Sequence, residues 1–467
     1  MKIRNFSLTV SVVILITMLS AACGSGSGTN HPSGQASSDQ ILLADTLERS
    51  LFEYIINPWY PRIIDTVNGG YISALENDWT LAGRFQTKAL VQQARHVWAT
   101  AFIYEHYPEK KEFLEYSAHG FRFLRDAMWD REYGGFHAYC TDDGKPEERS
   151  MDEKRIYGQA FAIYGLSQYY RMSQDQEALQ LAQKEFRWME EKPHDPVYGG
   201  YFEFIRRDGT PYGTGENGNH GNRRSPGRGL KDYNSSIHLM EALTELYRIW
   251  PDSLVRARLE EMFYLIRDTF VHPDGYLRLY FYPDWRLVTP QSMNDDSEEI
   301  LRFTSHFTYG HDVETAYLLL ETAHFLGLGE DEQTHKLAKR LVDHSLASGW
   351  DNETGGFWDE GLARDGKIEI INDHKSWWGQ IEGLNALLMM HLLYPEDPND
   401  YYGKFLKMWA YIDTYLIDKE HGGWYNNGLD TSPDTPKQMK SHIWKTSYHN
   451  TRGMIRCIQG LRGENEY

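Results

Sequence analysis

Apolar residues recur along this chain at helical spacing, and the helices that they predict are of two alternating kinds. The first kind has a single apolar stripe, as in Leu259, Met262, Phe263, Ile266 and Phe270 of SLVRARLEEMFYLIRDTF. Such a stripe predicts a helix with one face on the core and the other in solvent. The second kind is apolar on most faces, which is typical of a buried helix. These segments are TKALVQQARHVWATAFIY, EKRIYGQAFAIYGLSQYY, NSSIHLMEALTELYRIW, TYGHDVETAYLLLETAHFLG, KSWWGQIEGLNALLMMHLL and TSYHNTRGMIRCIQGL.

A short Gly-Gly-aromatic phrase separates the two helices of each pair. It reads NGGY, YGGF, YGGY, GGF and GGW, with a weaker DGY between the third and the fourth. The second glycine of each phrase, or the single glycine of DGY, stands at position 70, 135, 200, 275, 356 or 423. A period of this length indicates repeated supersecondary units. Paired glycines permit a tight turn, and the aromatic residue then begins a short strand.

Six exposed helices that alternate with six buried ones predict two concentric rings. The predicted fold is therefore all-α, an (α/α)6 barrel of six helix pairs with short β-hairpin turns at the Gly-Gly-aromatic motifs. An open solenoid of helix pairs is the alternative. We favour the closed ring because there are six units and no obvious polar capping repeat. The repeat runs from about residue 41 to about 462 without a linker, so we predict a single barrel domain over residues 41–467.

The amino terminus has the pattern of a targeting segment. Lys2 and Arg4 precede an apolar run from Leu8 to Leu19, which is too short to span a bilayer as a helix. The run ends in LSAAC at Cys23, which resembles a bacterial lipoprotein signal, although Leu19 stands four places before the cysteine instead of three. We predict a signal peptide over 1–22, lipidation of Cys23, and a flexible tail over 23–40. A plain secretory signal is the alternative; either way we expect export, with the lipoprotein anchored on the periplasmic or cell-surface side.

Composition narrows the class of ligand. The 467-residue chain has a net charge of −19, which argues against nucleic acid as a partner. Its 14 Trp and 31 Tyr exceed what packing requires, and aromatic faces commonly hold sugars, although most of these rings are expected in the core. Apart from Cys23, only Cys140 and Cys457 remain, too few for a disulfide framework, although one bridge is possible.

Polar residues of the kinds used in catalysis and sugar binding stand near the starts of the buried helices. In a closed ring all the inner helices start at one end, so these side chains would converge on one mouth although they are far apart in sequence. Concave, aromatic-lined sites with a few polar groups are typical of ligand binding. The residues are Arg95, Tyr157, Asn234, His238, His311, Glu314, Trp377, Trp378, Trp444 and His449.

Two of these positions share an H-x-x-E spacing, His238 with Glu241 and His311 with Glu314. Residues three apart on a helix face the same way. Each glutamate can therefore accept a hydrogen bond from its histidine and fix the tautomer. This arrangement suits a general acid or base that works near neutral pH.

Two other chemistries use similar residues. Three histidines and two glutamates could bind zinc or a di-metal centre, but the chain has no H-E-x-x-H and no matched pair of E-x-x-H motifs, so we predict no metal. A glycoside hydrolase needs two carboxylates across the scissile bond. Candidates by residue type are Asp130, Asp195, Asp232 and Asp312. The first two precede Gly-Gly turns, where a short polar side chain suits the turn itself.

In the order of these motifs the chain resembles the N-acylglucosamine 2-epimerase superfamily, and within it the cellobiose 2-epimerases. The resemblance covers about residues 41 to 462 and rests on KALVQQARHVW, EKRIYGQAFAIYGLSQYY, NSSIHLMEA, YGHDVETAYLL, KSWWGQIEG and WKTSYHNTR. The fold of that superfamily is the (α/α)6 barrel.

The resemblance also implies roles for individual residues. Arg95 matches the arginine that anchors the substrate, and His311 with Glu314 matches a catalytic pair. His449 matches the second catalytic histidine, and His238 a further histidine of the site. Trp444 and the Trp377–Trp378 pair match stacking residues, with either of the pair facing the sugar. Tyr157 and Asn234 complete the predicted substrate-binding set.

The activity that the resemblance implies is 2-epimerisation of the reducing-end glucose or mannose unit of a β-1,4-linked disaccharide, such as cellobiose to glucosyl-mannose. It would proceed through a cis-enediol, with two histidines as acid and base and no cofactor. Alternatives are a mannobiose 2-epimerase, an N-acylglucosamine 2-epimerase or an aldose–ketose isomerase. Further alternatives are a glycoside hydrolase and a non-catalytic sugar-binding lipoprotein.

The chain departs from the cellobiose epimerases in two respects besides its export signal. Where those enzymes tend to read N-T-H-L-H, it reads Asn234-Ser-Ser-Ile-His238, so the first histidine is absent. Two insertions, Gly213 to Gly229 and Thr289 to Phe303, precede mouth-forming helices. They are placed to reshape the subsites beyond the reacting sugar.

Overall fold

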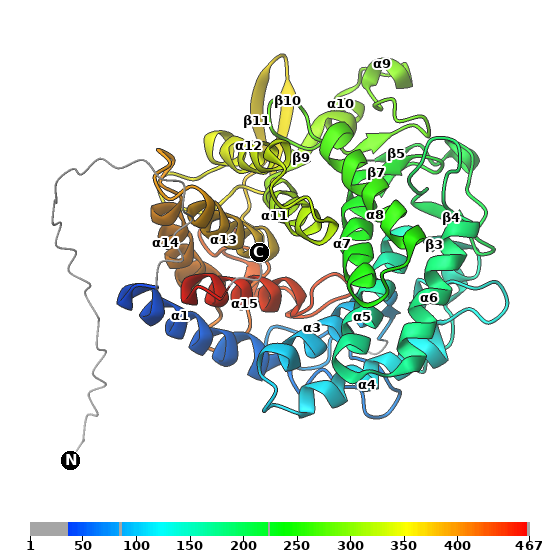
Figure 1. Ribbon diagram of the computed structural model, residues 1–467, viewed down its shortest axis with the longest axis horizontal. Coiled ribbons are helices and arrows are strands. Elements are labelled where there is room, and N and C mark those ends of the chain that lie inside the picture. Colours follow the sequence, from blue (N-terminus) through cyan, green and yellow to red (C-terminus); the bar gives the residue numbers. More distant parts are fainter. Residues whose placement is uncertain (1–35, 84–85, 223–224, 465–467) are drawn as a thin grey trace. The chain divides into compact units, whose positions relative to one another are not determined.

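Six inner helices follow one another around a closed ring (Figure 1). Each packs against the next one in the chain, and the last packs against the first. They are α3 (Leu90–His106), α5 (Ile156–Ser173), α7 (Tyr233–Ile249), α11 (Tyr309–Leu326), α13 (Trp377–Leu393) and α15 (Tyr448–Arg462). This computed structural model describes residues 36–83, 86–222 and 225–464, so the predicted signal peptide and Cys23 lie outside the described residues.

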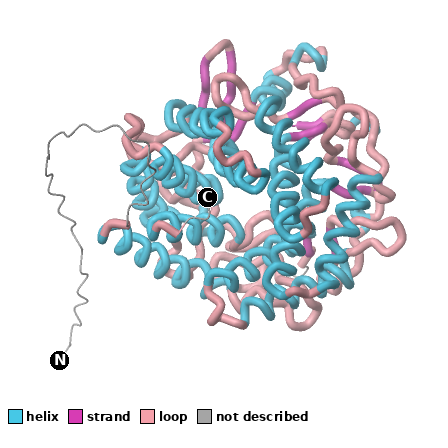
Figure 2. Tube along the Cα trace, viewed as in Figure 1, coloured by secondary structure: helices cyan, strands magenta, loops and turns pink. Residues whose placement is uncertain are grey.

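Six outer helices surround this ring, and each packs mainly on one inner helix. α1 packs on α15, and the other five pack on the inner helix that precedes them in the chain. They are α1 (Ser38–Leu51), α4 (Glu112–Phe123), α6 (Gln176–Glu191), α8 (Ser253–Leu265), α12 (Glu332–Ser348) and α14 (Tyr401–Tyr411). Figure 2 shows how little strand accompanies these two layers of helix. The predicted (α/α)6 barrel is confirmed.

Several short helical segments extend or connect these elements. Four outer helices end in a single π-helical turn before the glycine turn of their repeat: η1 (Phe52–Ile56), η2 (Leu124–Met128), η5 (Ile266–Phe270) and η6 (Ile412–Leu416). Brief connecting helices are α2 (Asn57–Trp59), η3 (Glu148–Ser150), η4 (Glu216–Gly218), α9 (Pro290–Met293), α10 (Glu298–Ser305) and η7 (Thr435–Lys437).

Helix α1 begins at Ser38, three residues before the predicted start of the domain. A capping box explains the earlier start: the Ser37 hydroxyl accepts from the backbone N–H of Gln40 at 3.2 Å, and the Gln40 side chain accepts from the backbone N–H of Ser37 at 2.9 Å. The predicted tail over 23–40 therefore overlaps the first residues of α1.

Short strands lead directly into four of the inner helices. β1 (Lys88–Ala89), β3 (Glu153–Arg155), β7 (Lys231–Asp232) and β9 (His306–Thr308) precede α3, α5, α7 and α11. Their antiparallel partners are β2 (Tyr139–Cys140), β4 (Phe204–Arg206), β8 (Tyr280–Phe281) and β10 (Glu360–Arg364), the last also paired with β11 (Lys367–Asn372). These pairs fix the entry of four inner helices at the same end of the barrel.

A buried lysine–aspartate pair holds five of the Gly-Gly turns. In each, a lysine that precedes the next inner helix donates to an aspartate that opens the turn, at 2.7 to 2.9 Å. The pairs are Lys88–Asp65, Lys154–Asp130, Lys231–Asp195, Lys375–Asp351 and Lys440–Asp418. Both glycines of each of these turns have positive φ, which side chains other than glycine rarely adopt. Two of the aspartates considered for a hydrolase, Asp130 and Asp195, are therefore engaged in holding the fold.

The two insertions lie beside β9 and contact each other. The first carries η4 and the strands β5 (Gly221–Asn222) and β6 (Ser225–Pro226), and the second carries α9 and most of α10. α10 packs on β5, β9 and β10, and Glu298 pairs with Arg364 of β10 at 2.8 Å. In Figure 1 α9, α10, β10 and β11 stand together at the upper edge of the view. Both insertions therefore border the entry of α11.

Cys140 and Cys457 are buried free thiols, so the bridge left open by the sequence is not formed. Among the described residues, no helix has the length and apolar character needed to cross a membrane.

Candidate active site

The candidate site residues occupy the first two turns of the inner helices, in two layers. The second or third position of a helix carries Tyr157, Asn234, His311, Trp378 or His449. The sixth position carries Arg95, Phe161, His238, Glu314 or Glu382, one from each of the first five inner helices. Because a helix rises about 1.5 Å per residue, the second layer lies roughly 5 Å deeper in the barrel. The deeper polar groups are almost fully buried, as the 4% exposure of Arg95 and 0% of Glu314 and Glu382 show.

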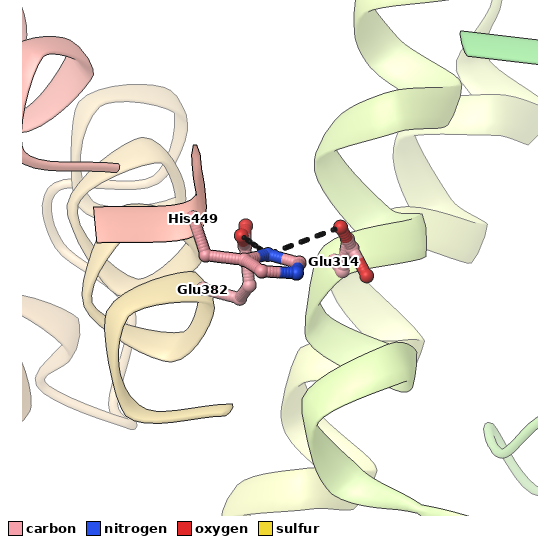
Figure 3. A group of neighbouring side chains, drawn as sticks. All are labelled: Glu314, Glu382 and His449. Atoms are coloured by element: carbon pink, nitrogen blue, oxygen red, sulfur yellow. Dashed lines mark hydrogen bonds and ion pairs between the residues drawn. The ribbon is translucent and has the colours of Figure 1, made fainter. Parts of the chain in front are cut away.

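His449 is held by a carboxylate that the sequence analysis did not single out. Its Nδ1 lies 2.6 Å from Oε1 of Glu382, on the neighbouring helix α13 (Figure 3). An Nδ1–H that donates to this carboxylate leaves Nε2 as the basic nitrogen. The histidine is 6% exposed. The pair is thus built as an oriented base at the start of α15.

Arg452 joins the carboxylates of three helices beneath this histidine. Its Nη2 donates to Oε1 of Glu382 at 2.7 Å and to Oε1 of Glu314, and its Nη1 donates to Oε1 of Glu241. The Tyr448 hydroxyl also donates to Glu241, at 2.6 Å. Arg452 is 0% exposed. This guanidinium supplies the positive charge that three buried carboxylates require.

The same carboxylates offer the spacing of a metal site. Oxygens of Glu314 and Glu382 and a nitrogen of His449 lie within 4.8 Å of one another. However, Arg452 already donates to the nearest oxygen of each glutamate. The donor set therefore fits a guanidinium as its cation, and the residues do not favour a metal.

One of the two predicted histidine–glutamate hydrogen bonds is present. Nδ1 of His238 lies 2.9 Å from Oε2 of Glu241. Although burial opposes ionisation of this carboxyl, Arg452 and His238 lower the pKa of Glu241 to about 2. Glu241 is thus an ionised acceptor that fixes the tautomer of His238.

The predicted hydrogen bond between His311 and Glu314 is not formed among the described residues. Nδ1 of His311 contacts the Thr308 hydroxyl instead, and Glu314 turns toward Arg452, with Nδ1 of His449 at 3.9 Å. An i, i+3 spacing sets the direction of two side chains, but a buried guanidinium is the stronger partner for a carboxylate. A hydroxyl can donate or accept, so the Thr308 contact permits either tautomer of His311.

Trp378 lies between the two histidines, whereas Trp377 does not. The Trp378 ring centroid is 4.6 Å from that of His311 and 5.8 Å from that of His449. Trp377 packs against the C-terminal segment, with Nζ of Lys445 5.2 Å from its ring centroid. Of the tryptophan pair, Trp378 is therefore the one that belongs to the site.

Arg95 connects two further residues of the predicted set. Its Nη2 donates to the Tyr157 hydroxyl at 2.8 Å, and its Nη1 donates to the Trp444 carbonyl oxygen at 3.1 Å. The Tyr157 ring stands edge-on to His238 at 5.3 Å. Trp444 is 39% exposed and so lies at the rim. Asn234 occupies the shallow layer, and its Oδ1 has no hydrogen-bond partner within the described part of the chain.

Burial sets the protonation of the central groups. It lowers the pKa of His311 well below the usual 6.5, and the neighbouring His238 and His449 add to this effect. It likewise lowers the pKa of His449, together with the positive charges of Arg95 and Arg452. Burial and the nearby Glu382 raise the pKa of Glu314 to about 7. Both histidines are therefore neutral near pH 7, the form in which an imidazole accepts a proton.

The other two carboxylates considered for hydrolysis also have structural partners. Asp232 caps helix α7, where its side chain accepts from the backbone N–H of Ser235 at 3.2 Å. Asp312 accepts from the backbone N–H of Leu277 at 3.0 Å and is 0% exposed. Burial raises the pKa of both carboxyls. All four carboxylates considered for hydrolysis are therefore engaged in contacts that hold the fold.

Sequence reasoning missed Glu382, Arg452 and Thr308. A signal for Glu382 was present, because an alignment of the inner helices by their starts places it at the same position as His238 and Glu314. Arg452 follows His449 by three residues, a spacing that puts both on one helix face.

The fold and the site together define an enzyme that places neutral histidines, an arginine and an exposed tryptophan at the mouth of an (α/α)6 barrel. The chain belongs to the N-acylglucosamine 2-epimerase (GlcNAc 2-epimerase) family, whose model matches residues 70–452. It is a carbohydrate epimerase, and the family supports activity at C2 of a sugar.

Several relatives are named cellobiose 2-epimerases. The chain is 26% identical to the cellobiose 2-epimerase of Bacteroides fragilis over 90% of this chain and 99% of that one. It is 28% identical to the enzyme of Ruminococcus albus over 89% and 98%. The solved structure of the Spirochaeta thermophila enzyme superposes with a TM-score of 0.76, at 27% identity, over 91% and 97% of the two chains.

Proposed function

We propose that this chain epimerises the reducing-end glucose or mannose unit of a β-1,4-linked disaccharide at C2, converting cellobiose to glucosyl-mannose through a cis-enediol without a cofactor. The observation that carries the proposal is the placement of two neutral imidazoles, His311 and His449, against the single ring of Trp378. The names of the relatives support the choice of disaccharide.

The chemistry requires removal and return of one proton. When the sugar ring opens, the C1 aldehyde makes the C2 proton acidic. One histidine takes that proton, and a planar enediolate forms as the electron pair moves toward O1. A second histidine then delivers a proton to the opposite face of C2, which inverts the configuration. Two bases are needed because a single base would return the proton to the face from which it came.

His449 and His311 fill these two roles. Glu382 orients His449 through Nδ1, so Nε2 is the nitrogen that exchanges the proton. The Thr308 hydroxyl permits His311 to act in either protonation state. Both residues can therefore serve in either direction of a reversible epimerisation.

In this proposal Arg95 and His238 interact with the oxygen atoms of the substrate. Arg95 is a permanent cation with 4% exposure, and such a group stabilises a developing enediolate oxygen most strongly where water is excluded. His238, with its tautomer fixed by Glu241, is placed to assist ring opening at O1 and O5. Tyr157, Asn234, Trp378 and Trp444 form the walls that hold the sugar.

The test is proton NMR in D₂O with the purified full chain and cellobiose, mannobiose, glucose, mannose and N-acetylglucosamine, each supplied separately. We expect deuterium at C2 and a gluco/manno mixture from cellobiose. A ketose product would instead identify an aldose–ketose isomerase, which shares the enediol. Release of a monosaccharide without exchange at C2 would contradict the proposal.

We also propose, from the sequence pattern alone, that the enzyme is exported and anchored to the membrane by a lipid on Cys23. The expected result in a bacterial host is a membrane-bound, lipid-modified chain that begins at Cys23, and a soluble product from Cys23→Ser. The same mass and the same soluble fraction for both chains would contradict this proposal.

A further inference from the structure

A line of contacts runs from the centre of the site to the strand that precedes helix α5. Arg95 donates to the Tyr157 hydroxyl, the backbone N–H of Tyr157 donates to Oε2 of Glu203 at 3.0 Å, and Nε of Arg155 donates to Oε1 of Glu203 at 2.7 Å. The side chain of Arg155 is 27% exposed, whereas Arg95 is 4% and Glu203 1% exposed. Arg155 is therefore the outermost member of a chain of contacts that begins at the reacting groups.

Strand β3 directs Arg155 away from the fold-holding contacts. Successive side chains of a strand point to opposite faces. Lys154 points to one face and is bound by Asp130 in the Gly-Gly turn, so Glu153 and Arg155 share the other face. On that face Glu153 pairs at 2.9 Å with Arg228, which belongs to the first insertion. Arg155 thus shares a strand face with Glu153, which is bound to an insertion that borders the mouth.

The guanidinium of Arg155 is held in place but only partly used. Glu203 binds its Nε, and the Phe204 ring lies 4.5 Å from its Cζ. Its two Nη groups have no hydrogen-bond partner among the residues that the structure describes. An arginine has five N–H donors, so both Nη groups remain to bind oxygen atoms of a ligand. Because the side chain is already oriented, such binding loses little conformational entropy.

A purely structural role would not require this arrangement. Neutralising Glu203 and the nearby Asp232 needs only a positive charge. The planar fork with two unused Nη groups, next to the residue that binds Arg95, instead suits hydroxyl recognition. The adjacent carboxylates balance the charge of Arg155, which favours a neutral sugar over an anionic one.

We propose that Arg155 binds hydroxyls of the second, non-reacting unit of a neutral disaccharide, and thereby sets the preference for a disaccharide over a monosaccharide. The inference rests on the proposed function, and it identifies the substrate as a disaccharide through recognition of its second sugar unit. Tyr157 separates the two subsites, with the reacting unit at Arg95 and the second unit at Arg155.

The test compares Arg155→Met and Arg155→Lys with the wild-type full chain, using the rate of C2 proton exchange in cellobiose and in glucose. Hydrogen bonds to a charged group contribute enough to predict a loss of about 10- to 100-fold in kcat/KM for cellobiose, mainly through KM. The loss with glucose should be at least about ten times smaller. The lysine variant keeps the charge but not the fork, so it should behave like the methionine variant. Arg149→Met is the matched control, because Arg149 is exposed and pairs with Glu147. This variant should leave kcat/KM unchanged with both cellobiose and glucose.

Equal losses of kcat/KM with both sugars would show that Arg155 only supports the fold. No loss of kcat/KM with either sugar would show that Arg155 binds no substrate. Each of these results overturns the inference. Wild-type exchange with monosaccharides alone would overturn it as well. Absence of C2 exchange in every sugar would refute the proposed function. In that case titration calorimetry with cellobiose tests the role of Arg155 separately. Weaker binding of cellobiose by Arg155→Met than by wild type supports the inference. Unchanged binding by the variant, or no binding by wild type, overturns it.

Discussion

The two central histidines of this site depend on partners outside their own helices. His449 takes its orientation from Glu382 of α13, and His311 takes its contact from Thr308 at the end of β9. Sequence spacing predicted the His238–Glu241 contact within one helix. It gave the wrong partner for Glu314, because the competing Arg452 lies 138 positions away along the chain. A local pattern carries no information about such a competitor.

Replacing Glu382 tests the orientation of His449. Glu382→Gln keeps the shape of the side chain but removes the charge that fixes Nδ1–H, so we expect C2 exchange to fall by about 10- to 1,000-fold with the fold retained. Steady-state rates by NMR, with circular dichroism for the fold, measure this. Glu185→Gln is a matched control, because Glu185 is a buried carboxyl on α6 whose pKa burial raises to about 8, and it should keep its rate. Wild-type rates for both variants would remove Glu382 from the site.

The protonation of His449 can be measured directly. Burial, Arg95 and Arg452 lower its pKa, so the neutral form should persist as the pH falls from 8 to 6. Histidine-selective NMR, assigned by the loss of one signal in His449→Gln, should show no titration of this ring in that interval. A midpoint at or above pH 6.5 would contradict the burial argument and would leave much of the base protonated at neutral pH.

At the scale of elements, the periodicity of the sequence was sufficient to predict the barrel. The alternation of amphipathic and apolar helices gave the two rings, and the Gly-Gly phrases gave the turns. The lysine–aspartate pairs that hold these turns were not predicted. The lysine of Lys154–Asp130 stands 24 residues after its aspartate, beyond any local pattern, and becomes evident only when the turn closes.

The Lys154–Asp130 pair should matter for stability and not for chemistry. Lys154→Met removes one of the cations that pair with the buried Asp130, so we expect the free energy of unfolding to fall by about 3–5 kcal/mol. The loss is somewhat smaller if Arg207, which also pairs with Asp130, compensates for the missing lysine. The rate per folded molecule should stay unchanged. Denaturant unfolding and C2 exchange measure the two quantities. Lys145→Met is the control, because its side chain is 79% exposed, and it should alter neither the stability nor the exchange rate. Loss of activity in a folded Lys154→Met variant would make Asp130 a catalytic candidate again.

At the scale of the whole molecule, Arg452 unites the site with the barrel. It belongs to α15, the last helix of the ring, and contacts carboxylates of α7, α11 and α13. These helices are distant in sequence, so the network forms only when the ring closes. The polar centre thus depends on the complete barrel.

Arg452→Met should therefore destabilise the entire domain. Three buried carboxylates would lose their shared cation, and we expect a loss of about 3–5 kcal/mol in the free energy of unfolding, still in one cooperative transition. Thermal unfolding followed by circular dichroism and by tryptophan fluorescence measures this. Arg364→Met, which removes a pair near the surface, is the control and should cost less than about 1 kcal/mol. A stability equal to wild type would show that the network does not hold the barrel together.

The two-histidine mechanism is decided by C2 proton exchange in D₂O with cellobiose, measured for the wild-type chain and for His311→Ala and His449→Ala. We expect deuterium at C2 and a gluco/manno mixture from the wild type, and a loss of about 10²- to 10⁴-fold in each variant with the fold intact. No exchange in the wild type, or more than a tenth of the wild-type rate in either variant, would contradict a two-histidine epimerisation at this mouth.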